Sequence, residues 1–197
     1  MEAGHELILR ARRICGQAHV ITDPSLLSVY RSDGQRRDGP LPLAVILPGS
    51  AAEVAGVVSA CTALAIRYVV RGAGTSRDGS SLPHSGEVLV VTTRMRQVLA
   101  LRGTELTVQT GAPLAGALPG GPRAWLGTDE LLGTVGGYVA RSASLTNLCA
   151  IELVGTDGRL MLLDARQPGY DLVGAFPGSR GRCGIAVTLT LRRLSQR

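Results

Sequence analysis

The stretch Arg71-Gly-Ala-Gly-Thr-Ser76 is the most informative part of this chain. Glycine at positions 72 and 74 removes side chains, so neighbouring backbone N–H groups can converge on an anion, and Thr75 and Ser76 can add hydroxyl donors. Such a loop suits a pyrophosphate group. It is not a Walker loop, because the chain has no lysine, and it is not a Rossmann fingerprint, because no third glycine opens a helix. By itself, a Gly-x-Gly turn is more often a simple turn.

The loop follows a strand, a helix and a second strand. Residues 43–47 are apolar and predict a buried strand, which Pro48-Gly49 ends. Residues 50–53 form a capping box that opens a helix to about residue 65, and residues 67–70 predict the second strand. Ligands bind at the carboxyl ends of strands in open α/β sheets. The glycine loop therefore lies where a ligand site is expected.

The rest of the chain combines short strands with helices. A helix is predicted over residues 3–18, and a hairpin over residues 151–163, where Asp157-Gly158 supplies a two-residue turn. Further strands are predicted at residues 87–91, 98–101, 105–109 and 185–194. The pattern predicts an α+β fold, with a single domain over residues 1–197 divided into two lobes at about residues 1–72 and 73–197.

Two further glycine clusters follow the first. One is Gly133-Thr-Val-Gly-Gly137, where paired glycines allow a flat ligand to lie against the main chain. The other combines Gly178-Ser-Arg-Gly181 with Gly184-Ile185, just before the last predicted strand. Each cluster alone is explained equally well by an ordinary turn. Three clusters in this order, separated by strands, favour a ligand site.

Composition limits the class of protein. The chain has 197 residues, 45% of them hydrophobic, which indicates a folded globular protein, and only six are aromatic. All 21 basic residues are arginine, and the net charge is +6. We attribute the absence of lysine to a GC-rich bacterial genome. Nucleic-acid binding is not expected, because no basic run is interleaved with aromatic residues.

Cysteines and histidines indicate no site of their own. The four cysteines and three histidines are scattered without metal-ligand spacing, so we expect neither a metal nor a disulfide framework, and a reducing cytoplasm is favoured. No apolar run reaches the roughly 18 residues of a membrane span, and the N-terminus has no signal pattern. We expect a cytoplasmic protein without membrane contact.

The ordered clusters resemble a known family. Together with Gly169-Tyr-Asp-Leu172, they are similar to the FAD-binding domain of the vanillyl-alcohol oxidase and p-cresol methylhydroxylase superfamily. Within it, the glycolate oxidase and D-lactate dehydrogenase flavoprotein subunits are the most similar branch. The resemblance covers about residues 20–194. It implies a two-lobed α+β domain of the p-cresol methylhydroxylase type that grips an extended FAD.

The resemblance also implies which residues contact the cofactor. The backbone of residues 72–76 would hold the pyrophosphate, Gly136 and Gly137 would flank the flavin side, and Gly184 with Ile185 would lie along the adenosine side. Some relatives attach the flavin through a histidine in the glycine loop; Thr75 stands there in this chain, so non-covalent FAD is expected. The full expected cofactor-binding set is Arg71, Gly72, Ala73, Gly74, Thr75, Ser76, Gly79, Thr134, Gly136, Gly137, Gly184 and Ile185.

The sequence departs from the family pattern in several places. Relatives usually continue into a substrate-binding cap domain, which these 197 residues do not include. Arg77-Asp78 follows the loop where small residues are usual, and Arg180 stands where an acid is typical. The segment between Gly137 and Ile151 is shorter than in relatives. The resemblance therefore implies a site completed by a partner chain or by a second copy in a homodimer.

Three residues near the second cluster are candidates for catalysis. Tyr138 and Arg141 replace small or amide residues and lie one helical turn apart, so both can point at a substrate. Asp129 precedes the cluster and can supply a carboxylate to the pocket. The alternative interpretations are core packing for Tyr138 and solvated surface charges for Asp129 and Arg141.

These observations predict a truncated FAD-binding protein, an oxidoreductase or flavoprotein subunit that acts on a small organic or natural-product substrate. Two alternatives stay open at this point. The fold can serve a non-redox reaction, such as cyclisation in bacterial secondary metabolism, or the chain can be a non-catalytic accessory subunit.

Overall fold

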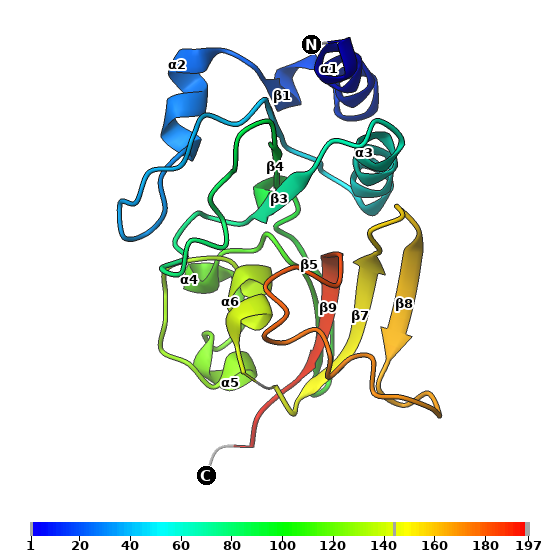
Figure 1. Ribbon diagram of the computed structural model, residues 1–197. Helices are drawn as coiled ribbons and strands as arrows, with labels where there is room; N and C mark the ends of the chain where they lie inside the picture. The colour runs from blue at the N-terminus through cyan, green and yellow to red at the C-terminus, as the bar shows by residue number, and fades with distance from the viewer. Residues whose placement is uncertain (1, 144, 196–197) are drawn as a thin grey trace.

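The computed structural model describes residues 2–143 and 145–195, whose strands form two sheets, one above the other in Figure 1. In the first sheet, three parallel strands lie beside one antiparallel edge strand. Its strands, in spatial order, are β1 (Val20–Ile21), β2 (Val45–Ile46), β4 (Val88–Val91) and β3 (Tyr68–Arg71). Every residue of β4 is buried, as expected for a central parallel strand with both faces covered.

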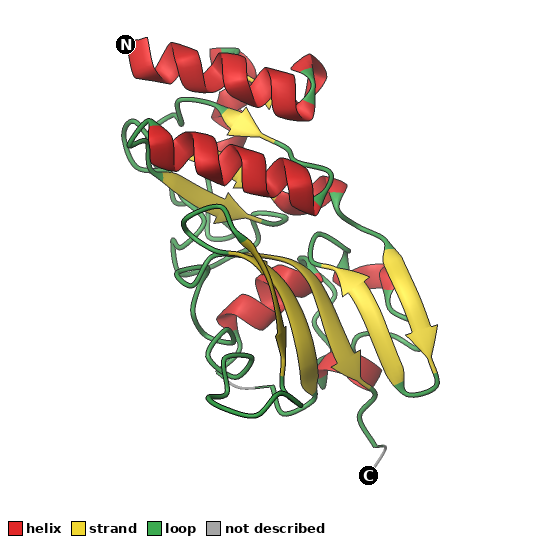
Figure 2. Cartoon of the chain, turned by 90° about the vertical axis from the view of Figure 1, so that its right-hand side faces the viewer, coloured by secondary structure: helices red, strands yellow, loops and turns green. Residues whose placement is uncertain are grey.

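Helices cover both faces of the first sheet. The two long helices α1 (Glu2–Cys15) and α3 (Ala51–Ala63) pack side by side on one face (Figure 2). The short helix α2 (Pro24–Leu27) and the 3₁₀ turn η2 (Ser28–Tyr30) pack on the other face, around Val45 and Leu89. A further 3₁₀ turn, η1 (Gln17–His19), connects α1 to β1.

The predicted capping box opens α3. The hydroxyl of Ser50 accepts a hydrogen bond from the Glu53 N–H at 3.2 Å. The Glu53 carboxylate accepts from the N–H of Gly49 at 2.8 Å, one residue before the cap. The first bond satisfies a donor that the first turn of a helix leaves free, and the second fixes the residue that leads into the cap. The chain therefore enters α3 in a defined direction from β2.

The second sheet is antiparallel throughout. Its strands, in spatial order, are β5 (Val98–Arg102), β6 (Glu105–Gln109), β9 (Ile185–Arg192), β7 (Leu148–Val154) and β8 (Leu160–Asp164). Three short helices pack on one face: α4 (Leu114–Ala117), α5 (Arg123–Leu126) and α6 (Val135–Arg141). The only tryptophan, Trp125, is buried in this second core and donates to the Pro119 carbonyl at 2.7 Å.

Helix α3 packs against both sheets. One continuous core contains Val54 and Val57 of α3 together with Val154, Ile185 and Val187 of the second sheet. The two sheets therefore share buried surface, and the α+β fold is confirmed.

The division between the sheets differs from the expected one. Strand β4 pairs between β2 and β3, so the first sheet extends to Val91, and the second begins at Val98 with the turn η3 (Thr92–Arg94) between them. The boundary expected near residue 72 is therefore wrong for the strands, because β4, which follows residue 72 in the chain, inserts between β2 and β3 and pairs in parallel with both.

The hairpin between β7 and β8 is present, but its turn is longer than expected. Gly155 and Arg159 are linked by a backbone hydrogen bond of 2.9 Å, which leaves residues 156–158 as a three-residue loop. None of the helices described by the structure is both long enough and apolar enough to cross a membrane.

Candidate functional site

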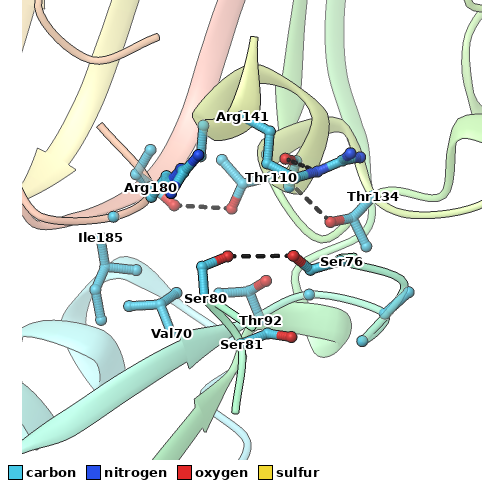
Figure 3. Close-up of a pocket in the computed structure, with 18 of the residues that line it drawn as sticks. Val70, Ser76, Ser80, Ser81, Thr92, Thr110, Thr134, Arg141, Arg180 and Ile185 are labelled. Carbon is cyan, nitrogen blue, oxygen red and sulfur yellow. Dashed lines mark hydrogen bonds between the residues drawn. The ribbon is translucent and has the colours of Figure 1, made fainter. Parts of the chain in front are cut away.

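A cleft lies between the two sheets, where β3, β4 and β6 end and β9 begins (Figure 3). It contains about 730 Å³ of space, part of it open to solvent. All three glycine clusters contribute to its walls. The lining residues are Val70, Gly72, Ala73, Gly74, Thr75, Ser76, Ser80, Ser81, Thr92, Thr110, Thr134, Gly136, Gly137, Ala140, Arg141, Phe176, Arg180, Gly181, Gly184, Ile185 and Ala186.

The glycine loop 72–76 forms the wall that belongs to the first sheet. Within the described residues, the backbone N–H groups of residues 73–76 donate to no protein acceptor. Gly72 has no room for a side chain, because a Cβ there would collide with the Thr134 hydroxyl across the cleft. Gly74 has a φ of +74°, and a Cβ there would collide with the guanidinium of Arg71. The loop therefore presents free N–H donors at a close approach between the two sheets.

Arg71 lies behind this loop and does not line the cleft. Its guanidinium donates to three backbone carbonyls, those of Tyr30 (3.2 Å), Ser32 (2.9 Å) and Ser81 (3.4 Å). Burial lowers the pKa of the Arg71 guanidinium, which nevertheless stays charged at neutral pH. Arg71 was expected to contact the cofactor directly. The structure instead places its guanidinium behind the loop, where it is hydrogen-bonded to the protein backbone and does not line the cleft.

The opposite wall is built from the start of α6 and the end of β6. The Thr134 hydroxyl caps α6 by accepting from the Gly137 N–H at 3.2 Å. The Gly136 N–H donates to the Thr110 carbonyl at 2.8 Å, and a Cβ at position 136 would lie 2.5 Å from the Thr110 Cβ. Position 136 therefore needs glycine for the close approach of α6 to the end of β6. The expected residues Thr134, Gly136 and Gly137 are brought together with the glycine loop.

The third wall precedes β9. A Cβ at Gly184 would collide with the Val154 carbonyl, so this position needs glycine for the close approach to β7. Ile185 is 1% exposed and contributes an apolar side chain to the end of the cleft. The expected pair Gly184 and Ile185 is therefore part of the same cleft as the other two clusters.

An ion pair links two of these walls. Asp78 Oδ2 lies 3.2 Å from Arg180 Nε, and Asp78 Oδ1 accepts from the hydroxyls of Ser76 and Ser80. Hydrogen bonds from Ser76 and Ser80 hold the pKa of the Asp78 carboxyl well below its usual range, and the Arg180 charge adds to the effect. Asp78 and Arg180, two of the residues that depart from the family pattern, thus contact each other.

The three catalytic candidates separate in the structure. Arg141 lines the cleft and forms an ion pair with Glu130 at 3.1 Å. Tyr138 packs against the second core, and its hydroxyl donates to the Leu126 carbonyl at 3.4 Å, so it does not line the cleft. Asp129 pairs with Arg123 in solvent. Tyr138 and Arg141 were expected to point toward the same substrate. They do not share the face toward the cleft, because packing against α5 turns the tyrosine inward.

Gly79 also lies outside the cleft lining. It stands in the loop beyond the ion pair, where a Cβ would lie 3.7 Å from the Arg37 guanidinium. Its neighbours Ser80 and Ser81 line the cleft instead.

Several residues that line the cleft were not predicted from the sequence. Thr92 and Thr110 directly follow β4 and β6, so their position at strand ends was a usable signal. Ser80, Ser81, Ala140 and Phe176 carry no such signal. The Ser81 hydroxyl stands apart among them, because it is buried and has no hydrogen-bond partner in the described residues.

The cleft offers donors and apolar surface but no acid or base. Its described lining contains Arg141 and Arg180, several hydroxyls and free N–H groups, and no histidine, aspartate, glutamate, tyrosine or cysteine. Such a site can bind an extended anionic ligand. Proton transfer would need a group from outside this lining.

Comparison with known proteins agrees with this geometry. The family described as FAD binding domain matches residues 42–161. Glycolate oxidase subunit GlcD of Escherichia coli is 30% identical over 193 residues, which cover 88% of this chain and 38% of the relative. D-2-hydroxyglutarate dehydrogenase of Xanthomonas citri is 30% identical over 192 residues, covering 87% of this chain and 41% of the relative.

Solved structures show the same fold. An alkyldihydroxyacetonephosphate synthase superposes with a TM-score of 0.79 at 17% identity, over 97% of this chain and 40% of that one. A p-cresol methylhydroxylase superposes with a TM-score of 0.77 at 18% identity, over 100% of this chain and 44% of that one. The resemblance inferred from the ordered glycine clusters is confirmed. The chain spans about two fifths of the length of the relatives it matches.

Proposed function

The chain belongs to the FAD binding domain family, and from this membership we propose that it binds FAD non-covalently in the cleft between its sheets and serves an oxidoreductase reaction. Bound FAD would supply the capacity to accept a hydride or electrons from a substrate. The protein's own residues would bind and orient the cofactor.

The observation that carries the proposal is the set of free N–H donors in the loop 72–76. Backbone donors that face a cleft and lack protein acceptors form a site for a diphosphate. Gly72 and Gly74 cannot accept a side chain, so the main chain stays exposed there. The cleft continues past Gly136 and Gly137 to Ile185, which suits an extended dinucleotide. The residues present therefore fit FAD.

Non-covalent attachment is supported by the chemistry of the lining. A covalent flavin bond in proteins needs a nucleophilic side chain, and the described lining contains no histidine, cysteine or tyrosine. Thr75 lies beside Gly133 at the loop. Denaturing the FAD-loaded protein is therefore expected to release all flavin into the soluble fraction, and flavin that stays with the precipitated chain would contradict this part.

The substrate class and the source of the catalytic base are proposed separately from FAD binding. The relatives are a glycolate oxidase subunit and a D-2-hydroxyglutarate dehydrogenase, so we propose a small 2-hydroxy acid as the substrate class. Because the described lining contains no acid or base, we propose that residues outside it, from a partner chain or a second copy of this chain, complete the substrate site.

A non-catalytic accessory role is the second candidate. The same absence of an acid or base in the described lining favours it. A non-redox cyclisation would also need such a group and gains no support from the cleft.

Free thiols at all four cysteines support a reducing, cytoplasmic location.

The test is FAD binding by a loop variant and its neutral partner. Ala73 is exposed, lines the cleft and has no positive φ, so a larger side chain is tolerated there. Ala73→Asp adds a negative charge opposite the diphosphate and is expected to weaken FAD binding about a hundredfold. Ala73→Asn has the same shape without the charge and should lose much less. Binding is measured by quenching of flavin fluorescence.

Two outcomes reject the proposal. The first is wild-type protein that gains no flavin absorption after incubation with FAD. The second is equal FAD affinity for Ala73→Asp and Ala73→Asn. A redox role is tested separately, by adding 2-hydroxy acids and an artificial electron acceptor to the FAD-loaded protein with and without its copurifying chains. Turnover only with a partner would support a completed site; no turnover in either case would favour the accessory role.

A further inference from the structure

Strand β8 is an open edge of the second sheet. Among the described residues it pairs with β7 alone, and it forms the outer border of the sheet (Figure 1). Three large apolar side chains stand exposed in succession along it, Leu160 at 48%, Met161 at 40% and Leu162 at 65%. Because successive residues of a strand point to opposite faces, this edge is apolar on both faces. An edge of this kind is a place where a further strand can pair.

The hydrogen bonds between β7 and β8 show which backbone groups face the open edge. The Gly155 N–H donates to the Arg159 carbonyl at 2.9 Å, and the Ala165 N–H donates to the Cys149 carbonyl at 2.8 Å. In an antiparallel pair, alternate residues bond to the neighbouring strand. The odd-numbered residues of β8 therefore bond to β7, and the even-numbered residues direct their N–H and C=O groups outward.

Two of these even-numbered residues keep their outward groups free. Within the described residues, no turn or loop hydrogen-bonds to the backbone of Leu160 or Leu162. The Asp164 carbonyl, in contrast, accepts from the Gln167 N–H at 3.1 Å in the turn that ends the strand. An antiparallel partner must therefore bring two donors and two acceptors at the spacing of Leu160 and Leu162.

A second copy of β8 meets this requirement. When Leu160 of each copy lies opposite the partner's Leu162, the two-fold axis passes through Met161. Each leucine pair then exchanges both of its N–H···O bonds, and all free groups of the edge are satisfied. The same register places leucine across from leucine and methionine across from methionine, so the exposed apolar side chains cover one another.

The charges at the two ends of β8 permit this arrangement. Asp157 pairs with Arg159 at 3.5 Å before the strand, and Asp164 pairs with Arg166 at 2.7 Å after it. Antiparallel pairing brings the start of one strand to the end of the other. Each end is a neutral pair, so no net charge opposes the contact.

The other edge of the same sheet lacks these properties. Strand β5 carries a bulge at Leu99, where its register with β6 shifts, and it ends in the exposed Arg102. A bulge and a charge both hinder the pairing of a further strand. Pairing β8 with β5 of another copy would also leave free edges and build an open array, whereas β8 with β8 closes on itself.

We propose that this protein forms a two-fold symmetric dimer in which the β8 strands of two copies pair antiparallel and join the two five-stranded sheets into one. The inference goes beyond the proposed function and does not rest on it, because residues 157–166 do not line the cleft.

Sedimentation equilibrium of two matched variants tests the surface. The wild type should sediment at micromolar concentration with twice the mass of one chain. Leu162→Lys places a charge against the partner's Leu160 and should sediment as a monomer. Leu99→Lys makes the same change at the β5 edge, where the side chain is 49% exposed, and should stay a dimer. Both side chains are exposed, so thermal melting should show that both variants remain folded.

Cysteine crosslinking tests the register and does not depend on the lysine variants. The background is Cys183→Ser, which removes the exposed thiol, since the other three are buried. Met161→Cys on the axis would bring the two Cα atoms to about 4.5 Å, within reach of a disulfide, and should give a covalent dimer on mild oxidation. Leu162→Cys is the control, because its two copies are out of step by two residues and lie beyond the roughly 7 Å limit.

Three results overturn the inference. They are a wild type that sediments as a monomer up to millimolar concentration, a Leu162→Lys protein that stays a dimer, and crosslinking of Leu162→Cys in preference to Met161→Cys. FAD binding of Leu162→Lys should equal that of the wild type, so a failure of the dimer and a failure of the proposed function are measured separately.

Discussion

Gly74 shows how strongly a single backbone position constrains this site. Its φ of +74° is accessible mainly to glycine, and a Cβ there would also press on the Arg71 guanidinium. Gly103, in the turn between β5 and β6, has a φ of +59°, and a Cβ at that position would meet no atom within 4 Å. The two glycines therefore share backbone strain but differ in what surrounds them.

Substitution by alanine separates these two contributions. Gly103→Ala should lower the free energy of unfolding by about 1 kcal/mol, the cost of a left-handed non-glycine residue. Gly74→Ala should lower it by about 2–4 kcal/mol, because Arg71 must also move. Urea denaturation of both variants measures the difference. Equal losses would show that the Arg71 contact carries no energy.

At the scale of elements, the pair Asp78–Arg180 joins the loop after β3 to the segment before β9. Both side chains are partly exposed, at 28% and 54%, so the pair alone should contribute modestly. Its position across the cleft nevertheless ties two segments that are far apart in the sequence. Hydrogen bonds from two serines keep the Asp78 carboxylate in one orientation, which reduces the entropy lost on pairing.

A double-mutant cycle with Asp78→Asn and Arg180→Gln should give a coupling free energy of about 0.5–1 kcal/mol at pH 7. Because the pKa of Asp78 is lowered in the folded protein, this stabilisation is present above the ordinary carboxyl pKa of about 4 and is lost as pH falls below it. The exposed pair Arg123–Asp129 is the control, and its coupling should be near zero. A coupling that persists unchanged at acid pH would contradict the ion pair.

For the whole molecule, α3 is the element that makes one folding unit of two sheets. Its valines share a core with Val154, Ile185 and Val187 of the second sheet. Neither sheet can separate without exposing this apolar surface to water. The two lobes should therefore unfold together.

This expectation is measurable with the single tryptophan. Trp125 is buried in the second core, so its fluorescence reports on the second sheet, whereas far-ultraviolet circular dichroism reports on the helices of both lobes. The two unfolding curves should coincide in a single transition. A fluorescence change that precedes or follows the loss of helix signal would show that the lobes unfold separately.

Much of the architecture was predictable because its signals are local. The capping box at Ser50, the strands on both sides of α3 and the loop 72–76 follow from residues that are close together in the chain. The boundary between the sheets was not predictable in this way. Whether residues 88–91 pair with β3 or with a later strand depends on long-range pairing, which a single sequence does not display.

The family, the α+β class and the three backbone segments that form the cleft can all be inferred from the amino-acid sequence, since glycine and turn requirements belong to each segment alone. The environment of the side chains depends instead on the folded molecule. Folding placed Tyr138 in the core and Arg71 behind the loop, and it brought Asp78 to Arg180. The direction and the partners of a side chain depend on which distant segments pack beside it. These segments come together only when both sheets pack against α3.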